Sequence, residues 1–356
     1  MLFSILKFLI NIIFLIIKSL IILLITSIIF YLYTYLYFKR KKIPYENSHI
    51  IIFGGSSGLG EAISILLSKK GNKISIASRS EKKLKETKEK ILKQNPNSKC
   101  EYYICDMTIT ENIKETLINS IKQFGFPKLI INSVGIAHPG FIEDISYEQY
   151  EKDMNLNYFS SLKMMKEFKK IYDEEKSNEK IDIVFIGSVL GLIGSIGYSC
   201  YSPTKYALKG LIDCLRFEFL NENINFHYYA PSNMETPGLK IENENKPLIV
   251  SQMENNVKTI SAEDAAYFLL CNLDKYVITT EPDLELLKNC FSFMGRHSFL
   301  DLFLVPIGIV GVVFSRLGIE KNIRKNFERK KKKKLKMNNF FFFVNFSDKI
   351  KYISPK

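Results

Sequence analysis

The sequence predicts an α/β fold, in which a doubly wound parallel sheet follows an N-terminal membrane anchor and precedes a C-terminal apolar segment. Three observations lead to this prediction. Short apolar runs alternate with helical patterns from Ser48 onward, the stretch from Met1 to Phe38 is almost wholly apolar, and a second apolar stretch spans Phe299 to Phe314. The 356 residues suffice for one large domain or two ordinary ones.

The N-terminal apolar run is long enough to cross a membrane, because a spanning helix needs about 20 apolar residues. A cleavable signal peptide fits less well, since its apolar region is shorter and ends in small residues. Here the run ends in four tyrosines and the basic quartet Lys39 to Lys42, which is typical of the cytoplasmic interface. We therefore expect residues 1–42 to form a transmembrane anchor with a basic flank, and the chain after Lys42 to face the cytosol. One span, two short spans and an in-plane segment all stay open.

Strand and helix patterns alternate through the next part of the chain. We expect strands over 49–53, 73–77, 100–105, 128–132, 181–186 and 225–229, and helices over 61–70, 81–93, 111–124, 147–170 and 202–220. Alternation at this spacing implies right-handed crossovers and a parallel sheet that is covered on both faces. We expect this α/β domain to run over residues 43–290.

The C-terminal part carries the second apolar stretch and a basic run. Pro306, Gly308 and Gly311 interrupt the apolar stretch, so an interfacial or re-entrant segment competes with a span. We assign residues 291–336 to a membrane-associated segment with its basic run. Residues 337–356 form a phenylalanine-rich tail without a fold signal.

The net charge of +13 at first suggests a nucleic-acid partner. Eleven of these net positive charges lie in two runs, 39–42 and 329–336, beside long apolar stretches, as cytosolic charge does in membrane proteins. A nucleic-acid-binding domain spreads its basic residues over a folded face, so we expect no nucleic acid. The six cysteines form no C-x-x-C pair and indicate reduced cytosolic thiols, and the four scattered histidines predict no metal site.

A glycine-rich turn, residues 54–60, joins the first strand to the first helix and indicates a Rossmann-type dinucleotide site. Glycines permit the sharp turn and let the backbone approach a pyrophosphate, while the helix N-terminus offers N–H groups to that anion. A lone glycine cluster is weak, but its place between a buried strand and a helix strengthens the prediction. The expected cofactor-binding residues here are Gly54, Ser56, Ser57, Gly58 and Gly60.

The residues after the next strands predict which nicotinamide cofactor binds. An acid after the second strand would favour NAD, whereas Arg79 can pair with the 2′-phosphate of NADPH or be a solvated surface residue. Asp106 follows the third strand, where it either accepts the adenine amino group or caps the next helix. Asn132 ends the fourth strand and is expected to border the cofactor.

Tyr201 and Lys205 carry the clearest chemical signal. They are four residues apart and would share one helix face, where the ammonium would lower the phenol pKa from its usual value of about 10. Tyr201 could then protonate a carbonyl oxygen as hydride arrives from a nicotinamide, and Ser188 could donate a hydrogen bond to the same oxygen. A tyrosine–lysine pair alone is usually a surface feature. The order Ser, Tyr, Lys behind a glycine-rich turn indicates a carbonyl reductase.

These residues resemble the short-chain dehydrogenase/reductase superfamily over roughly residues 48–266. The resemblance implies that Asn157, with Asn155 as the rival, holds a water that links Lys205 to solvent as a proton relay. It also implies that the loop 231–238 covers the nicotinamide. This fold often forms a homodimer through the long helices after strands four and five, but the sequence leaves the oligomeric state open.

Within the superfamily, the chain looks most like the 3-ketodihydrosphingosine reductases. That family has an apolar N-terminal anchor, Gly-Gly-Ser-Ser-Gly, an arginine after strand two, and a Y-S-x-S-K-x-A-x-x-G motif that resembles residues 201–210. The resemblance implies NADPH-dependent reduction of a long-chain lipid ketone, 3-ketodihydrosphingosine (3-dehydrosphinganine), to dihydrosphingosine (sphinganine). The implied location is the endoplasmic reticulum membrane, with the catalytic domain facing the cytosol.

Three departures from the family pattern stand at Phe53, at Ser133-Val134 and at Ser160, and none of them removes a proton-transfer residue. Two alternatives stay open. One is another reductase anchored in the endoplasmic reticulum, acting on a steroid, a retinoid or another lipid carbonyl. The other is a degenerate fold that serves as a membrane scaffold, although a scaffold need not keep Ser188, Tyr201 and Lys205 together.

Overall fold

The computed structural model describes residues 42–175, 177–254, 257 and 259–281, together with parts of the segment 11–32. Within this described part, one helix, Asn11–Ile28, is long and apolar enough to cross a membrane by length and composition. The predicted C-terminal apolar segment, residues 291–336, and the tail, 337–356, lie outside the described residues.

A seven-stranded sheet forms the centre of the described part, with the strand order β3-β2-β1-β4-β5-β6-β9 and every neighbouring pair parallel. The predicted doubly wound parallel sheet is therefore confirmed. Its strands are β1 (His49–Phe53), β2 (Lys73–Ser78), β3 (Lys99–Ile104), β4 (Leu129–Asn132), β5 (Ile181–Ile186), β6 (Ile224–Ala230) and β9 (Val277–Thr279). The strand order reverses between β1 and β4, which is where such sheets bind their ligands.

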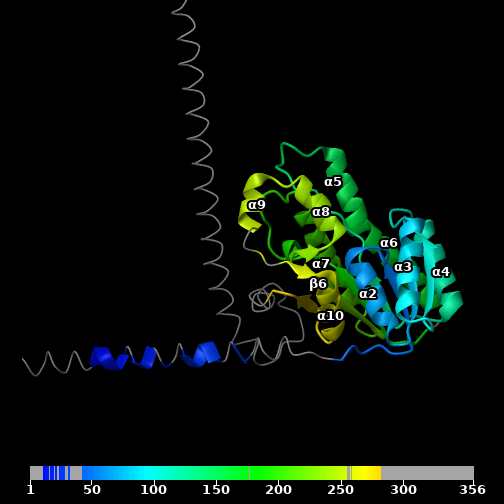
Figure 1. Ribbon diagram of the computed structural model, residues 1–356, viewed down its shortest axis with the longest axis horizontal. Coiled ribbons are helices and arrows are strands. Elements are labelled where there is room, and N and C mark those ends of the chain that lie inside the picture. The colour runs from blue at the N-terminus through cyan, green and yellow to red at the C-terminus, as the bar shows by residue number, and fades with distance from the viewer. Residues whose placement is uncertain are drawn as a thin grey trace, which may run out of the picture.

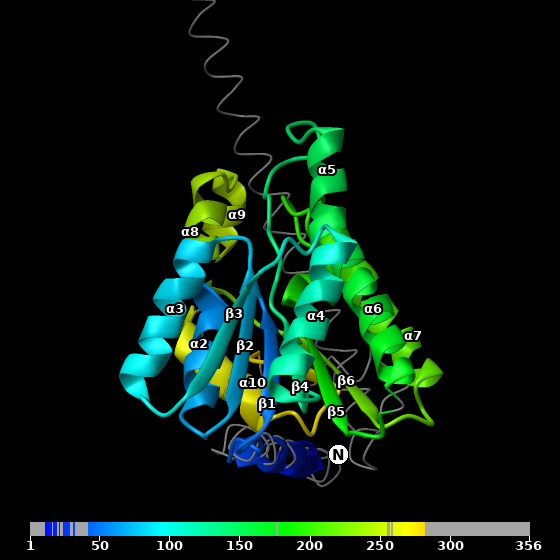
Figure 2. The ribbon, with the colours of Figure 1, turned by 90° about the vertical axis from the view of Figure 1, so that its right-hand side faces the viewer.

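Helices cover both faces of this sheet (Figure 2). The helices α2 (Gly58–Ser68), α3 (Glu81–Gln94) and α10 (Ala262–Cys271) pack on one face, and α4 (Thr110–Phe124), α6 (Ser160–Glu174) and α7 (Ser202–Glu218) pack on the other. The strands contribute side chains to both faces, because alternate residues of a strand point in opposite directions. Ile50 and Ile52 face the first layer, whereas Ile51 and Phe53 face the second, and all four are fully buried.

Three further helices stand beyond the edge where the strands end (Figure 1 and Figure 2). They are α5 (Tyr147–Met154), which follows β4, and α8 (Pro237–Glu244) and α9 (Leu248–Glu254), which follow β6. In the chain, β7 (Met234–Glu235) precedes α8 and β8 (Ile260–Ser261) follows α9. These two short strands pair in a separate two-stranded sheet. The loops and helices at this edge bring the predicted site residues together.

The sequence-based boundaries differ from the structure mainly at three places. Helix α2 begins at Gly58 rather than at residue 61, because the glycine-rich turn leads directly into it. The expected helix over 147–170 is divided by a π-helical turn, Asn155–Phe159, and then continues to Glu174. Strand β9 was not predicted, since three residues are too few to show a periodic pattern, and the other elements after β6 (β7, α8, α9, β8 and α10) were not predicted either.

Candidate active site

Tyr201 and Lys205 lie at the start of α7, with the Lys205 Nζ 5.6 Å from the centroid of the Tyr201 ring. Lys205 is 3% exposed, and its Nζ donates a hydrogen bond to the carbonyl of Ile186, the last residue of β5, at 2.9 Å. Helix α7 thus carries the pair, and β5 fixes the ammonium. Burial lowers the pKa of Lys205 from 10.5 to about 8.

Ser188 follows β5 and lies beside the Tyr201 phenol. Burial raises the pKa of Tyr201 above its usual value, by more than the side-chain hydrogen bond with Ser188 lowers it. The expected net lowering of this pKa is therefore wrong, because removal of the phenolate from water outweighs the groups that favour the phenolate. The phenol is thus protonated at neutral pH, as a proton donor must be before the reaction.

Asn157 lies in the π-helical turn, and its side chain joins three parts of the site. Its amide donates to the Ile136 carbonyl and to the Thr204 hydroxyl, both at 2.9 Å, and its carbonyl oxygen accepts from the Ile136 N–H at 2.9 Å. Thr204 in turn donates to the Tyr201 carbonyl at 2.7 Å. Asn157 is 1% exposed, whereas Asn155 is only partly buried, so the structure favours Asn157 over its rival. π-Helical turns are frequent at functional sites.

Tyr228 of β6 is a positioning residue that the sequence did not reveal. Its hydroxyl accepts from the Ser188 N–H at 3.2 Å and donates to the Ser188 carbonyl at 3.1 Å, and the ring is fully buried. A Cβ at Gly187 or at Gly191 would collide with Tyr228, so these two glycines make room for the ring. In the sequence, the two glycines near Ser188 are the signal that could have indicated a large side chain packed against this segment. They do not indicate that this side chain is Tyr228.

The glycine-rich turn has the shape that a pyrophosphate requires. Gly54 has φ +80° and lies against the backbone of Ser133, while a Cβ at Gly60 would collide with the Gly54 carbonyl oxygen. Ser57 is the N-cap of α2, and its side chain makes no capping hydrogen bond. The first N–H groups of α2 therefore point out of the helix without a side-chain cap, as an anion site at a helix N-terminus needs. These residues fit a bound dinucleotide.

The loop before α8 approaches the glycine-rich turn. Gly58 has φ +53°, and a Cβ there would lie 3.2 Å from the side chain of Thr236, the N-cap of α8. The family resemblance placed this loop over the nicotinamide. The structure brings Thr236 next to the glycine-rich turn, so Thr236 joins the candidate residues of the cofactor cleft.

The other predicted cofactor residues follow β2, β3 and β4. Arg79 is exposed, and among the described residues its side chain has no hydrogen bond or ion pair, so it is available to a phosphate.

The side chains of Asp106 and Asn132 hold the turns that follow β3 and β4. Asp106 accepts from the Thr108 N–H and hydroxyl at 2.9 and 2.8 Å, so its carboxylate fixes the turn after β3. Asp106 does not cap α4, because the N-cap residue of that helix is Ile109. Asn132 is 2% exposed, donates to Ser161 at 2.9 Å and accepts from the Val134 N–H at 3.1 Å. Asn132 therefore holds the loop that borders the cleft.

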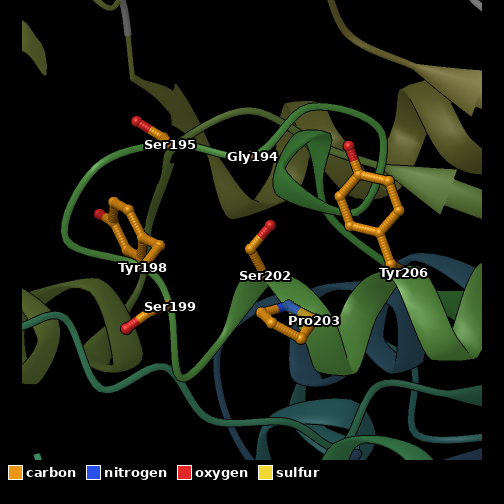
Figure 3. A pocket seen from close by; sticks show the side chains of 7 residues that line it. All are labelled: Gly194, Ser195, Tyr198, Ser199, Ser202, Pro203 and Tyr206. Carbon is orange, nitrogen blue, oxygen red and sulfur yellow. The ribbon is translucent and has the colours of Figure 1, made fainter. Parts of the chain in front are cut away.

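A hollow of about 540 Å³ lies at the N-terminal end of α7 (Figure 3). It is lined by the loop before α7 and by the first turns of α7: Gly194, Ser195, Tyr198, Ser199, Ser202, Pro203 and Tyr206. Ser188, Tyr201 and Lys205 do not line it, although Ser202 follows Tyr201 directly. The Tyr198 and Tyr201 rings lie 6.3 Å apart, centroid to centroid.

Known proteins match both the sequence and the fold. The short chain dehydrogenase family matches residues 48–247. A 3-ketodihydrosphingosine reductase of Dictyostelium discoideum is 32% identical over 320 residues, which cover 83% of this chain and 95% of that protein. The 3-ketodihydrosphingosine reductase of Yarrowia lipolytica is 29% identical over 300 residues, covering 81% of this chain and 80% of that protein.

Solved structures share the fold at lower identity. Levodione reductase has a TM-score of 0.60 and 21% identity, covering 67% of this chain and 98% of its own. Actinorhodin polyketide ketoreductase, solved with NADPH, has a TM-score of 0.57 and 17% identity, covering 67% of this chain and 97% of its own. The resemblance seen in the sequence is confirmed. The chain therefore belongs to the short-chain dehydrogenase/reductase family of nicotinamide-dependent oxidoreductases, and the curated relatives that it matches over most of its length are 3-ketodihydrosphingosine reductases.

Proposed function

We propose that this enzyme uses NADPH to reduce the 3-keto group of 3-ketodihydrosphingosine to dihydrosphingosine in sphingoid-base synthesis. The observation that carries the proposal is the match to the Dictyostelium discoideum 3-ketodihydrosphingosine reductase, which covers 95% of that protein. The clustering of Ser188, Tyr201 and Lys205 at the carboxyl edge of the sheet supports it. These side chains supply what a ketone reduction requires, namely a hydrogen-bond donor, a proton donor and a nearby cation.

In this proposal, each residue has a distinct role at the ketone oxygen. A bound nicotinamide supplies the hydride. Ser188 donates a hydrogen bond to the oxygen, and Tyr201, which is protonated at neutral pH, gives up its phenolic proton. Lys205 stabilises the resulting phenolate. Asn157 tethers the loop at Ile136 and the first turn of α7 through Thr204, so the proton donor keeps its place.

The preference for NADPH over NADH rests on Arg79. This guanidinium lies just past β2, is exposed, and has no acidic neighbour within the segment 77–80 that would favour the unphosphorylated ribose. It also lies close enough to Asp106 for its charge to contribute to the lowered pKa of that carboxyl, after the two hydrogen bonds from Thr108. A cation at this position matches the charge of a 2′-phosphate.

The membrane location follows from the substrate and from the N-terminal helix. A long-chain lipid ketone partitions into the bilayer, and an enzyme anchored by the apolar helix Asn11–Ile28 meets it there. The basic residues 39–42 favour an orientation with the reductase domain in the cytosol, and the endoplasmic reticulum is the expected membrane. A homodimer through α6 and α7 is compatible with the exposed aromatic side chains of Tyr206 and Phe217 on α7.

The test is a reduction assay on the full-length protein in detergent or vesicles. We expect loss of NADPH absorbance with 3-ketodihydrosphingosine, and a loss roughly 10²–10⁴ times slower with the Tyr201→Phe variant. A panel of steroid, retinoid and other lipid ketones identifies a different substrate if there is one. No turnover of 3-ketodihydrosphingosine, in vesicles where the Dictyostelium discoideum relative is active, would refute the proposal.

A further inference from the structure

His138 lies on the loop that passes alongside the catalytic tyrosine. Before His138 on this loop, a Cβ at Gly135 would lie 3.1 Å from the Lys205 Nζ, and the Ile136 N–H donates a hydrogen bond to the Asn157 side chain. Downstream, the Gly140 N–H donates to the Gly197 carbonyl at 2.8 Å. The loop thus runs from Lys205 to the residue before Tyr198, and both Lys205 and Tyr198 neighbour the Tyr201 ring.

Asp153 of α5 joins His138 to the segment that carries Tyr201. This side chain is fully buried and accepts from His138 Nδ1 at 2.8 Å, from Gln149 Nε2 at 2.8 Å and from Cys200 Sγ at 3.4 Å. Gln149 Nε2 also lies 2.9 Å from His138 Nδ1, but both nitrogens can donate to the carboxylate between them. Burial raises the pKa of the Cys200 thiol to about 12, so Cys200 remains an S–H donor. Because Cys200 immediately precedes Tyr201, the Asp153 carboxylate connects His138 to the residue next to Tyr201.

The carboxylate also determines what His138 can offer to a ligand. An ionised carboxylate only accepts hydrogen bonds, so the proton of a neutral imidazole lies on Nδ1, and Nε2 keeps its lone pair. The Nε2 atom has no hydrogen-bond partner among the described residues, and the side chain is 32% exposed. His138 therefore offers a hydrogen-bond acceptor from a partly exposed side chain, on the loop whose residues Gly135 and Ile136 contact Lys205 and Asn157.

Negative charge surrounds the catalytic tyrosine on a second side as well. Burial is the main cause of the raised pKa of Tyr201, and the charges of Glu242 and Asp153 raise it further. Glu242 and Glu254 both lie within hydrogen-bond distance of the Tyr198 hydroxyl, and one lysine, Lys246, pairs with both. This cluster on α8 and α9 therefore keeps one excess negative charge. A cationic group next to the reacting ketone would be stabilised by this field.

We propose that His138, held by Asp153, accepts a hydrogen bond from an ammonium group on the carbon next to the ketone, and so selects 2-ammonio ketones over neutral ketones. This assignment rests on the proposed function, because 3-ketodihydrosphingosine carries its amino group on that carbon. His138 is then a specificity-determining residue that contacts the substrate, and Asp153 is a positioning residue that acts through it.

The experiment compares two ketones that differ only in the amino group, 3-ketodihydrosphingosine and 1-hydroxyoctadecan-3-one, on the full-length protein in vesicles. We expect His138→Leu to lower kcat/KM for the amino ketone by about tenfold or more, the loss typical of one charge-assisted hydrogen bond, and to change kcat/KM for the neutral ketone less than about twofold. His138→Gln, whose amide oxygen can still accept, should keep most of the preference. NADPH binding measured by fluorescence verifies that each variant is folded.

Gln149→Leu is the matched control, because it removes an amide that contacts both the Asp153 carboxylate and His138 Nδ1, while the His138–Asp153 hydrogen bond and the Nε2 atom of His138 are kept. It should retain the preference for the amino ketone. Equal losses for both ketones in His138→Leu, or an equal loss of preference in Gln149→Leu, would overturn the assignment while leaving the proposed function intact. A wild-type protein that reduces neither ketone would refute the proposed function and this assignment together.

Discussion

Replacing Tyr228 by phenylalanine tests whether a buried hydroxyl on β6 positions the catalytic serine. The ring is fully buried, and phenylalanine keeps its volume, so the change removes the hydroxyl without opening a large cavity. The Ser188 carbonyl retains its bond from the Gly191 N–H at 3.0 Å, but the Ser188 N–H loses the Tyr228 oxygen as its partner. An unpaired buried N–H costs about 1–3 kcal/mol. We expect the free energy of unfolding to fall by about 2 kcal/mol, which lowers Tm by roughly 4–8 °C for a domain of this size.

The same substitution should reduce activity because Ser188 is no longer held against the substrate carbonyl. Complete loss of an oxyanion donor costs about 10²–10³ in rate, and a displaced donor costs less, so we expect a drop in kcat/KM of about tenfold. Ser188→Ala combined with Tyr228→Phe should be no slower than Ser188→Ala alone, since the hydroxyl acts through Ser188. The assays are NADPH oxidation with 3-ketodihydrosphingosine and thermal unfolding.

Tyr229→Phe is the matched control for this experiment. Tyr229 is the next residue on β6 and is also fully buried, but its hydroxyl donates to the Ala265 carbonyl on α10, on the opposite face of the sheet, at 3.0 Å. We expect Tyr229→Phe to lose stability with unchanged kcat/KM. The reasoning is refuted if both variants lose activity equally, or if Tyr228→Phe loses stability alone.

Three further predictions concern the proton donor, the cofactor and the pH dependence. Tyr201→Phe should lower turnover by roughly 10²–10⁴ while NADPH binding, measured by fluorescence, is retained; unchanged turnover would mean that another group donates the proton. Arg79→Gln should lower kcat/KM with NADPH about tenfold and leave the value with NADH unchanged, and equal effects on both cofactors would contradict a contact with the 2′-phosphate. Burial lowers the pKa of Lys205 from 10.5 to about 8, so its ammonium is present below this pH and is lost above it. The kcat/KM profile, which reports the free enzyme, should therefore fall as pH rises through about 8, and a flat profile to about pH 10 would count against a role for the ammonium.

The doubly wound sheet could be predicted because local patterns determine it. Buried runs such as residues 49–53, a glycine-rich turn and amphipathic helices follow one another along the chain, and parallel strands joined by helices allow few arrangements. The short elements after β6 could not be predicted in this way. Strand β9 has three residues, and it forms because it pairs with Tyr228 to Ala230 at the edge of the sheet.

The sequence by itself determined the reaction type, because Tyr201 and Lys205 lie one helical turn apart and Ser188 follows a buried strand. Only the tertiary structure shows that Asn157, and not Asn155, is fully buried and hydrogen-bonded to Ile136 and Thr204. It also decided that burial raises the pKa of Tyr201. The pairs Tyr228–Ser188 and His138–Asp153 join residues 40 and 15 positions apart, so no local pattern indicates them. Periodicity reports which face of an element a side chain occupies, whereas hydrogen bonds and desolvation depend on which elements meet in the folded chain.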